Sequence, residues 1–219
     1  MLREVAFLGA LNSANNSGSY APGMRIILSD FMSLDGVVQA PGGAEEDTDG
    51  GFRNGGWSMP YFDPEAMGGA IGEAMAETEA LLFGRRTWRV MADAWPGRAG
   101  DSFADQMNAI PKYVASRTLT ESHVEWNTTV LPADDAIGAI RRLRDSDGGG
   151  VQVMGSASLA EQLVRNDLVD EYRLMIEPVF LGGGKRIFPA DGAVRPLELV
   201  STSTSSTGVL ICTYRPASS

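Results

Sequence analysis

The sequence predicts an α/β protein with a mostly parallel central sheet, an antiparallel C-terminal edge and helices on both faces. Short, dense apolar runs at residues 26–28 and 81–83, and the mainly apolar segment 151–154, are typical of strands buried on both faces. Segments with helical spacing separate these runs, whereas the last two strands follow each other without a helix between them. No internal repeat or linker divides residues 24–219, so we expect a single domain there.

Residues 1–23 are predicted to be a poorly ordered N-terminal extension. Residues 12–23 are polar and rich in Gly, Ser and Asn, as terminal tethers often are. The apolar run at residues 5–11 is short and follows Glu4, whereas a signal peptide has a longer apolar core and a more basic start. Met24 stands directly before the first strand, so the sequence leaves open whether the extension belongs to the native protein.

The first half of the domain begins with a strand at residues 25–32, which ends in a turn at Asp35-Gly36. Residues 41–56 are rich in Gly, Asp and Glu and are expected to form a mobile loop. A helix is expected from about residue 65 to residue 79, a strand at 80–83 and a helix at 87–94. Pro96 and Gly97 end this helix, because proline clashes with the preceding turn and glycine favours a helix terminus.

The second half continues the alternation. Strands are expected at residues 112–116 and 128–131, and Asp134 is a good capping residue for a helix that reaches residue 144. A buried strand at 151–154 precedes a helix whose apolar residues Leu159, Leu163 and Val164 share one face. The remaining predicted strands are 172–176, 197–202 and 209–214.

Composition excludes several classes of function. The net charge of −10 argues against nucleic acid as a partner, because a phosphate backbone requires a basic surface. One cysteine (Cys212) and one histidine (His123) cannot supply a His/Cys zinc site, so no metal is expected. No apolar run approaches the roughly 20 residues of a membrane span. We therefore expect a cytoplasmic protein that binds neither membrane nor nucleic acid.

The segment Gly84-Arg85-Arg86-Thr87 follows an apolar strand and is predicted to bind phosphate. A helix N-terminus offers unpaired N–H groups and a positive dipole end, and arginine forks match phosphate oxygens. We expect both guanidinium groups and Thr87 to converge on one point. The alternative is a basic first helical turn that faces solvent, which the helix dipole disfavours.

Gly155-Ser156, followed by Ala157 and Ser158, forms a second candidate phosphate site. A glycine at the end of a strand lets the backbone approach a diphosphate, and the next helix offers its free N–H groups. The pattern does not match the Rossmann glycine fingerprint. The alternative is a tight strand–helix turn without a ligand.

The order of these pieces resembles the dihydrofolate reductase fold, and most closely the reductase domain of bifunctional riboflavin-biosynthesis deaminase–reductases. The resemblance covers residues 24–215, and four segments carry it: residues 25–36, 83–88, 153–162 and 168–188. It implies that NADPH is the cofactor and that its adenosine-side phosphates, including the 2′-phosphate, lie at residues 84–87. Its diphosphate would lie at residues 155–158.

The resemblance implies further site residues. Ser116 and Arg117 would approach the adenine ribose and its phosphate, although Arg117 could equally be an ordinary loop residue. The backbone near Phe31 and Val38 would contact the nicotinamide carboxamide. Similar proteins are commonly homodimers, with the closing strands at the interface, and the apolar run at 209–211 is compatible with this arrangement.

The substrate end is less sharply defined by the sequence. Candidate proton donors or substrate anchors are Asp30, Asp35, Asp63 and Glu65, and Asp63 and Asp35 are assigned here as catalytic. Asp63 lies near the position of the catalytic carboxylate in folate reductases, but Asp35 could simply form a turn and Asp63 could cap a helix. Asp30 and three aromatic residues are assigned to the substrate: Trp57, Tyr61 and Phe62.

The sequence also departs from the family that it resembles. Riboflavin-pathway reductases carry a substrate-binding glutamate just before their glycine pair, where this chain has Met154, and the deaminase half is absent. The leading hypothesis is an NADPH-dependent reductase of a pyrimidine- or pteridine-like ring, similar to 5-amino-6-(5-phosphoribosylamino)uracil reductase. The alternatives are a non-catalytic nucleotide-binding or regulatory module, a dihydrofolate reductase-type enzyme, and a flavin-dependent enzyme.

Overall fold

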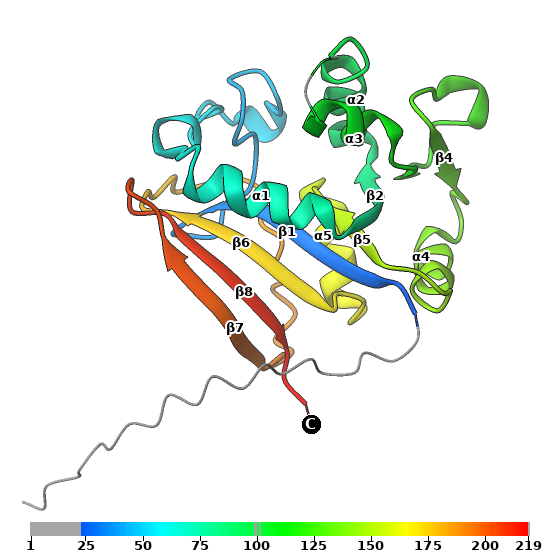
Figure 1. The fold of residues 1–219 in the computed structure, drawn as a ribbon. Helices are drawn as coiled ribbons and strands as arrows, with labels where there is room; N and C mark the ends of the chain where they lie inside the picture. Colours follow the sequence, from blue (N-terminus) through cyan, green and yellow to red (C-terminus); the bar gives the residue numbers. More distant parts are fainter. Residues whose placement is uncertain (1–22, 99, 101, 219) are drawn as a thin grey trace, which may run out of the picture.

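The computed structural model describes residues 23–98, 100 and 102–218. Apart from Gly23, the predicted N-terminal extension lies outside these residues. Eight strands form one sheet in the order β4-β3-β2-β5-β1-β6-β8-β7 (Figure 1). The strands are β1 (Arg25–Ser33), β2 (Thr78–Gly84), β3 (Lys112–Ala115), β4 (Thr128–Leu131), β5 (Gly150–Val153), β6 (Glu171–Glu177), β7 (Leu197–Thr204) and β8 (Leu210–Pro216).

Strand directions confirm the predicted fold class. β1 lies at the centre and pairs in parallel with β5 and β6, while β2, β3 and β4 extend the parallel part beyond β5. β8 pairs antiparallel with both β6 and β7, which gives the antiparallel edge. Each of the first five strands is therefore followed by a crossover, and the C-terminal ends of the parallel strands share one edge.

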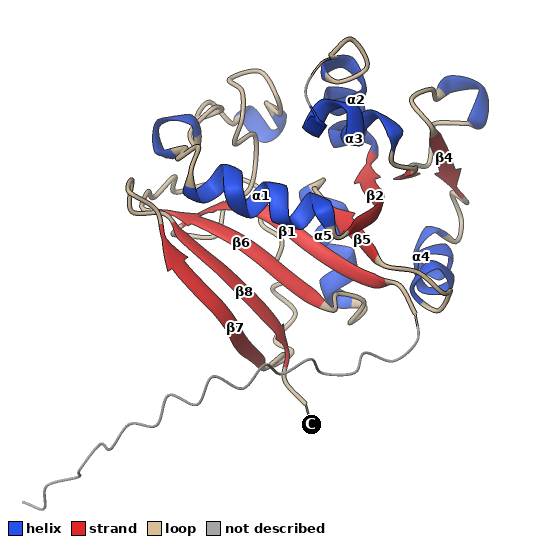
Figure 2. Ribbon diagram, viewed as in Figure 1, coloured by secondary structure: helices blue, strands red, loops and turns tan. Residues whose placement is uncertain are grey.

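Helices cover both faces of the sheet (Figure 2). One core joins α4 (Ala136–Arg144) and α5 (Ala157–Arg165) to alternate strand residues such as Leu28 and Val153. The other joins α1 (Ala66–Ala76), α2 (Arg85–Ala94) and α3 (Ser102–Ala109) to Leu81 and Phe83. The two-residue repeat of a strand sends successive apolar side chains into opposite cores. In the described part of the chain, no helix has the length and apolarity needed to cross a bilayer.

Several elements differ from the sequence prediction, most of them by one or two residues at an end. α2 begins at Arg85 with Gly84 as its N-cap, so Thr87 lies within the first turn and does not cap the helix. α1 ends at Ala76 and β2 begins at Thr78, a little earlier than expected. α3 was not predicted, because only Ala104 and Met107 of its eight residues are buried, which leaves little helical periodicity in the sequence.

Candidate active site

A cavity of about 570 Å³ opens where β1 and β5 end and extends beneath α1 to β6, β7 and β8. Its wall at the sheet edge includes the first turns of α2 and α5. The loop that follows β1 contributes residues 38–42, 46 and 47. Ligands of open parallel sheets bind outside the carboxyl ends of the strands, and this cavity has that position.

Two glycines bring the first turns of α2 and α5 together. The N–H of Gly84 donates to the carbonyl of Gly155 at 3.1 Å. A Cβ on Gly84 would lie 2.1 Å from Ser156 Oγ, and one on Gly155 would lie 3.0 Å from Thr87 Oγ1. Gly155 also has a φ of 93°, which favours glycine. The close approach of these two helix starts therefore requires glycine at both positions.

Both helix N-termini are open to ligand. The N-cap residues are Gly84 for α2 and Ser156 for α5, and neither makes a side-chain capping bond. Thr87 and Ala157 line the cavity within the two first turns. Uncapped N–H groups and two positive dipole ends at one cavity wall form an arrangement that favours a phosphate or diphosphate.

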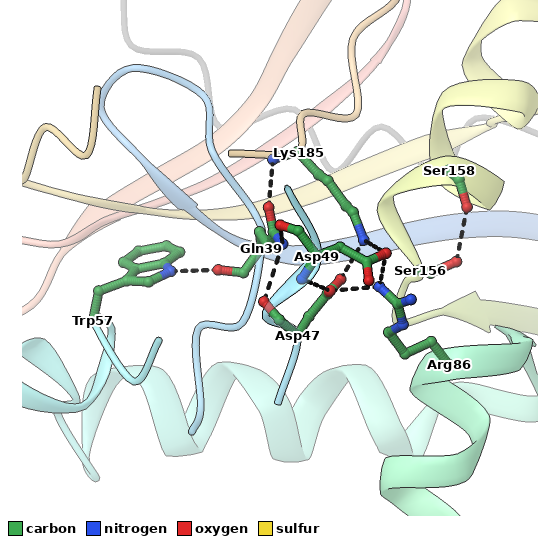
Figure 3. Close-up of polar contacts among 8 residues, drawn as sticks. All are labelled: Gln39, Asp47, Asp49, Trp57, Arg86, Ser156, Ser158 and Lys185. Carbon is green, nitrogen blue, oxygen red and sulfur yellow. Dashed lines mark hydrogen bonds and ion pairs between the residues drawn. The ribbon is translucent and has the colours of Figure 1, made fainter. Parts of the chain in front are cut away.

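Arg86 belongs to a cluster of four charged residues at the cavity mouth, which we call the Arg86 cluster (Figure 3). Its guanidinium group binds the carboxylates of Asp47 and Asp49. Lys185 Nζ binds the same carboxylates at 2.6 and 2.9 Å. The hydrogen bond from Arg86, followed by that from Lys185, lowers the pKa of Asp49 to about 2. Gln39 adds hydrogen bonds to the backbone of Asp47, Asp49 and Lys185. The loop expected to be mobile is thus held against α2 by several bonds.

The two neighbouring arginines do not converge on one point, which corrects the sequence prediction. Arg86 turns toward the cavity mouth, whereas Arg85 is exposed and donates to Thr118 Oγ1 at 3.3 Å. Ser116 Oγ accepts two backbone N–H bonds and shapes the turn after β3. Arg117, between Ser116 and Thr118, is exposed. Arg85 therefore lies beside the loop that carries Arg117, outside the cavity.

Asp63 lies outside the cavity, with partners that account for it structurally. Its Oδ2 accepts bonds from the backbone N–H and the hydroxyl of Ser206 at 2.9 and 2.7 Å. Its Oδ1 accepts the N–H groups of Glu65 and Ala66 at the start of α1. These bonds, with the Ser206 hydroxyl first, lower the pKa of Asp63 to about 2. The carboxylate assigned from sequence as catalytic therefore joins α1 to the β7–β8 turn.

Asp35 has a similar structural position in the turn after β1. It accepts bonds from Ser33 Oγ at 2.7 Å and from the N–H groups of Leu181 and Gly182. The Ser33 bond is the main cause that lowers the pKa of Asp35. Like Asp63, this carboxylate does not line the cavity, so neither is positioned to act on a ligand there.

The aromatic residues assigned to the substrate also lie outside the cavity wall. Trp57 is buried, and its indole N–H donates to the carbonyl of Gln39 at 2.8 Å (Figure 3). The carbonyl of Tyr61 accepts a bond from Thr207, and Phe62 is 37% exposed. Trp57 thus stabilises the loop after β1, and the predicted flat aromatic wall is not formed by these three side chains.

About half of the sequence-predicted site residues meet in the cavity. The residues that line it are Asp30, Phe31, Val38, Arg86, Thr87, Gly155, Ser156 and Ala157. Gly84 borders them through its contacts with Gly155 and Ser156, and the Ser158 hydroxyl lies 3.2 Å from that of Ser156. The residues farther out are Arg85, Ser116 and Arg117 on one side, and Asp35, Trp57, Tyr61, Phe62 and Asp63 on the other.

Asp30 is the acidic residue of this set that faces the cavity. Its Oδ2 has no exposed surface and no hydrogen-bond partner among the described residues. Burial, followed by the negative charges of Glu46 and Glu177, raises its pKa well above the usual 3.8. Glu46 also lines the cavity and accepts the N–H groups of Gly42 and Gly43. Burial raises the pKa of Glu46 as well. This part of the cavity therefore favours carboxyl groups in their protonated form.

Several cavity residues were missed by sequence reasoning. Gln152 interrupts the apolar strand 151–154, and that polar residue in a buried run was a signal that could have revealed it. Glu171 and Arg173 line the far end, where Glu171 is 2% exposed and binds Arg173 at 2.6 Å and Arg215 at 2.9 Å. Asp47 carries no comparable signal, because an acidic residue in a glycine-rich loop indicates only a solvated segment.

The sheet topology, with a cavity at the carboxyl edge of the parallel strands, is that of a dihydrofolate reductase-like fold. The chain belongs to the RibD C-terminal domain family, whose model matches residues 24–211. A relative from Bacillus subtilis, the uncharacterized protein YyaP, is 28% identical over 194 residues, which are 87% of this chain and 94% of YyaP.

Solved structures share the fold at low identity. A putative riboflavin biosynthesis protein from Shewanella sp. PV-4 has a TM-score of 0.64 and 18% identity, with 89% of this chain and 100% of that chain covered. Dihydrofolate reductase from Enterococcus faecalis, complexed with NADP(H), has a TM-score of 0.56 and 13% identity, with 89% and 97% covered. A Thermotoga maritima deaminase/5-amino-6-(5-phosphoribosylamino)uracil reductase has a TM-score of 0.57 and 16% identity, with 89% and 57% covered.

Proposed function

We propose that this protein is an NADPH-dependent reductase that transfers a hydride to a pyrimidine- or pteridine-like heterocycle. The observation that carries the proposal is the meeting of two uncapped helix N-termini, those of α2 and α5, at one end of a cavity. The cavity continues beneath α1, where a flat ring would find space. The complex of the Enterococcus faecalis enzyme with NADP(H) supports the choice of cofactor.

The residues at this end fit a dinucleotide. Gly155 gives close backbone access, and Thr87 offers a hydroxyl beside it. The N–H groups at the starts of α2 and α5 would hold the diphosphate, and the backbone near Phe31 and Val38 would hold the carboxamide. NADPH supplies the hydride when it is bound, and the chain orients the ring and keeps water away from it.

The extra phosphate of NADPH would bind Arg85 and Arg117. Both side chains are exposed, and neither has a carboxylate partner among the described residues. Arg86, in contrast, is already neutralised by Asp47 and Asp49. We therefore assign Arg85 and Arg117 to the 2′-phosphate and Arg86 to the position of the loop over the cavity.

Fluorescence titration with NADPH and with NADH tests this assignment. Arg85→Ala and Arg117→Ala should each weaken NADPH binding by about 10- to 100-fold, because a charge-assisted bond to phosphate contributes about 1.5–3 kcal/mol. Neither substitution should change NADH binding. Arg89→Ala, an exposed arginine one turn further along α2, is the matched control and should bind both cofactors as the wild type does.

Two results would contradict the proposal in different ways. Failure of the wild type to bind NADPH at about millimolar concentration, above the usual range of enzyme affinities for small molecules, would end the reductase proposal. Equal losses of NADPH and NADH affinity in the arginine variants would leave the cofactor but remove the 2′-phosphate assignment.

A non-catalytic nucleotide-binding or regulatory module is the second candidate. It is favoured by Met154, which lines the cavity where similar riboflavin-pathway reductases carry a glutamate. Stopped-flow measurement of NADPH absorbance with dihydrofolate, small pterins and riboflavin intermediates separates the two candidates. Turnover with any of them excludes the module, and dihydrofolate turnover identifies a dihydrofolate reductase-type activity.

We also propose that the protein forms a homodimer through β7 and β8. Two apolar side chains on these strands, outside the cavity wall, support the proposal: Leu199 and Leu210 are 54% and 41% exposed. β7 is the edge strand of the sheet. Apolar side chains grouped at an edge strand favour a second protein surface as their cover.

A further inference from the structure

Asp30 occupies the position in the cavity from which a proton could reach a bound acceptor. The parallel register pairs Leu28 with Val153, so Asp30, two residues further along β1, lies at the level of the Gly155 turn. Asp30 and Gly155 both line the cavity. The carboxyl group is therefore beside the proposed dinucleotide site, where hydride transfer would occur.

One oxygen of Asp30, Oδ2, is buried without a hydrogen-bond partner among the described residues. The hydroxyl of neighbouring Ser29 is likewise buried without a partner in the described part of the chain. A buried carboxylate without donors is costly, whereas the protonated form carries no charge and has an O–H to donate. The charged groups that act on Asp30 are Glu46 from the loop and Glu177 from β6, and both favour the protonated form.

The two cations of the Arg86 cluster form ion pairs with carboxylates other than that of Asp30. Arg86 of α2 and Lys185 of the loop after β6 both bind Asp47 and Asp49. Their charges are therefore largely balanced by two carboxylates before they could act on Asp30. Nothing in the Arg86 cluster replaces the missing partner of Asp30 Oδ2.

Four other acidic residues that could be compared with Asp30 do not offer the same chemistry. Asp35 and Asp63 lie outside the cavity, and hydrogen bonds to both favour their ionised forms. Glu46 accepts two backbone N–H groups, and Glu177 accepts the hydroxyl of Ser58 and does not line the cavity. Asp30 alone among these five combines a position in the cavity wall with an unpartnered oxygen.

We propose that Asp30 is the proton donor of this protein and delivers its proton to the ring nitrogen or oxygen that adjoins the reduced carbon. The proposal rests on the reductase function proposed above. As the hydride arrives at carbon, the π electron pair of the C=N or C=O bond moves to the heteroatom. Asp30 gives its proton to that atom and becomes a carboxylate, which then takes a proton from water.

The first test measures the protonation of Asp30 without ligand. In protein labelled with ¹³C at aspartate carboxyl groups, one NMR resonance should titrate well above the ordinary aspartate range, as buried carboxyl groups can. That resonance should be missing in Asp30→Asn. Asp93→Asn, at an exposed position on α2, is the control and should retain it. If every aspartate titrates within or below the ordinary aspartate range, or if the high resonance survives in Asp30→Asn, the proposal is overturned.

The second test separates proton delivery from cofactor binding. By fluorescence titration, the NADPH affinity of Asp30→Asn should lie within about twofold of the wild-type affinity. With any acceptor that the wild type reduces in the stopped-flow measurement, Asp30→Asn should turn over at least about 100-fold more slowly. Asp30→Glu should recover part of the rate. Undiminished turnover in Asp30→Asn would overturn the role of Asp30 and leave the reductase intact. Absence of NADPH binding in the wild type would instead refute the reductase proposal, and the Asp30 donor role would be overturned with it, whatever the NMR titration shows.

Discussion

Replacing Glu177 by glutamine should remove part of the pH dependence of folding stability. Glu177 ends β6, is fully buried, and accepts a hydrogen bond from Ser58 Oγ at 2.7 Å through Oε1. Its Oε2 has no hydrogen-bond partner among the described residues. Burial is the main cause that raises the pKa of Glu177 to about 7 from an ordinary 4.5. The folded protein therefore holds this proton more tightly than the unfolded chain does.

The sign and the size follow from this difference in pKa. Between pH 4.5 and about 7 the folded state binds more protons than the unfolded state, so the free energy of unfolding falls as the pH rises. At 1.36 kcal/mol for each pH unit, the stability lost across this window is about 3 kcal/mol. Glutamine keeps the shape and can still accept the Ser58 hydroxyl, but it carries no charge at any pH.

Urea unfolding at intervals between pH 5 and pH 8 measures the effect. Glu177→Gln should match the wild type near pH 5 and exceed its stability by about 3 kcal/mol at pH 8. Asp30 contributes a fall of the same sign in both proteins. Because the charge of Glu177 also helps raise the pKa of Asp30, the difference between the two proteins measures Glu177 together with this coupling. Glu198→Gln, an exposed position on β7, is the control and should follow the wild-type curve. A constant difference between Glu177→Gln and the wild type from pH 5 to pH 8 would refute the reasoning.

Two further predictions concern the helix starts and the sheet edge. Gly84→Ala should lower both the melting temperature and the NADPH affinity, because its Cβ would lie 2.1 Å from Ser156 Oγ. A Cβ at Gly97 has nothing within 4 Å, so Gly97→Ala is the control and should change neither quantity. Equal behaviour of the two variants in thermal melts and fluorescence titrations would contradict this view of the Gly84 contact. Light scattering after size exclusion should give twice the chain mass for the wild type and a shift toward one chain mass for Leu199→Arg, and a wild-type monomer at micromolar concentration would count against the proposed β7–β8 interface.

The sequence by itself determined the fold class and most of the elements. Strand positions could be predicted because the apolar runs at 26–28 and 81–83 must be buried on both faces of a sheet. The sequence also predicted a strand–glycine–helix turn at Gly84 and at Gly155, and the structure has both turns. Such turns can be predicted because glycine allows a close approach of the backbone that other residues do not. α3 was missed because its pattern of buried residues is too sparse to show a helical period.

The tertiary structure decided what each polar side chain does. Arg85 and Arg86 are neighbours with the same chemistry, yet Arg86 meets Asp47 from a segment 39 residues away and Arg85 does not. Asp63 finds Ser206, which lies 143 residues further along the chain, and is thereby removed from the cavity. The local sequence contains no record of such distant partners. A carboxyl group becomes a catalytic candidate through the partners that folding brings to it or withholds from it, as Asp30 illustrates.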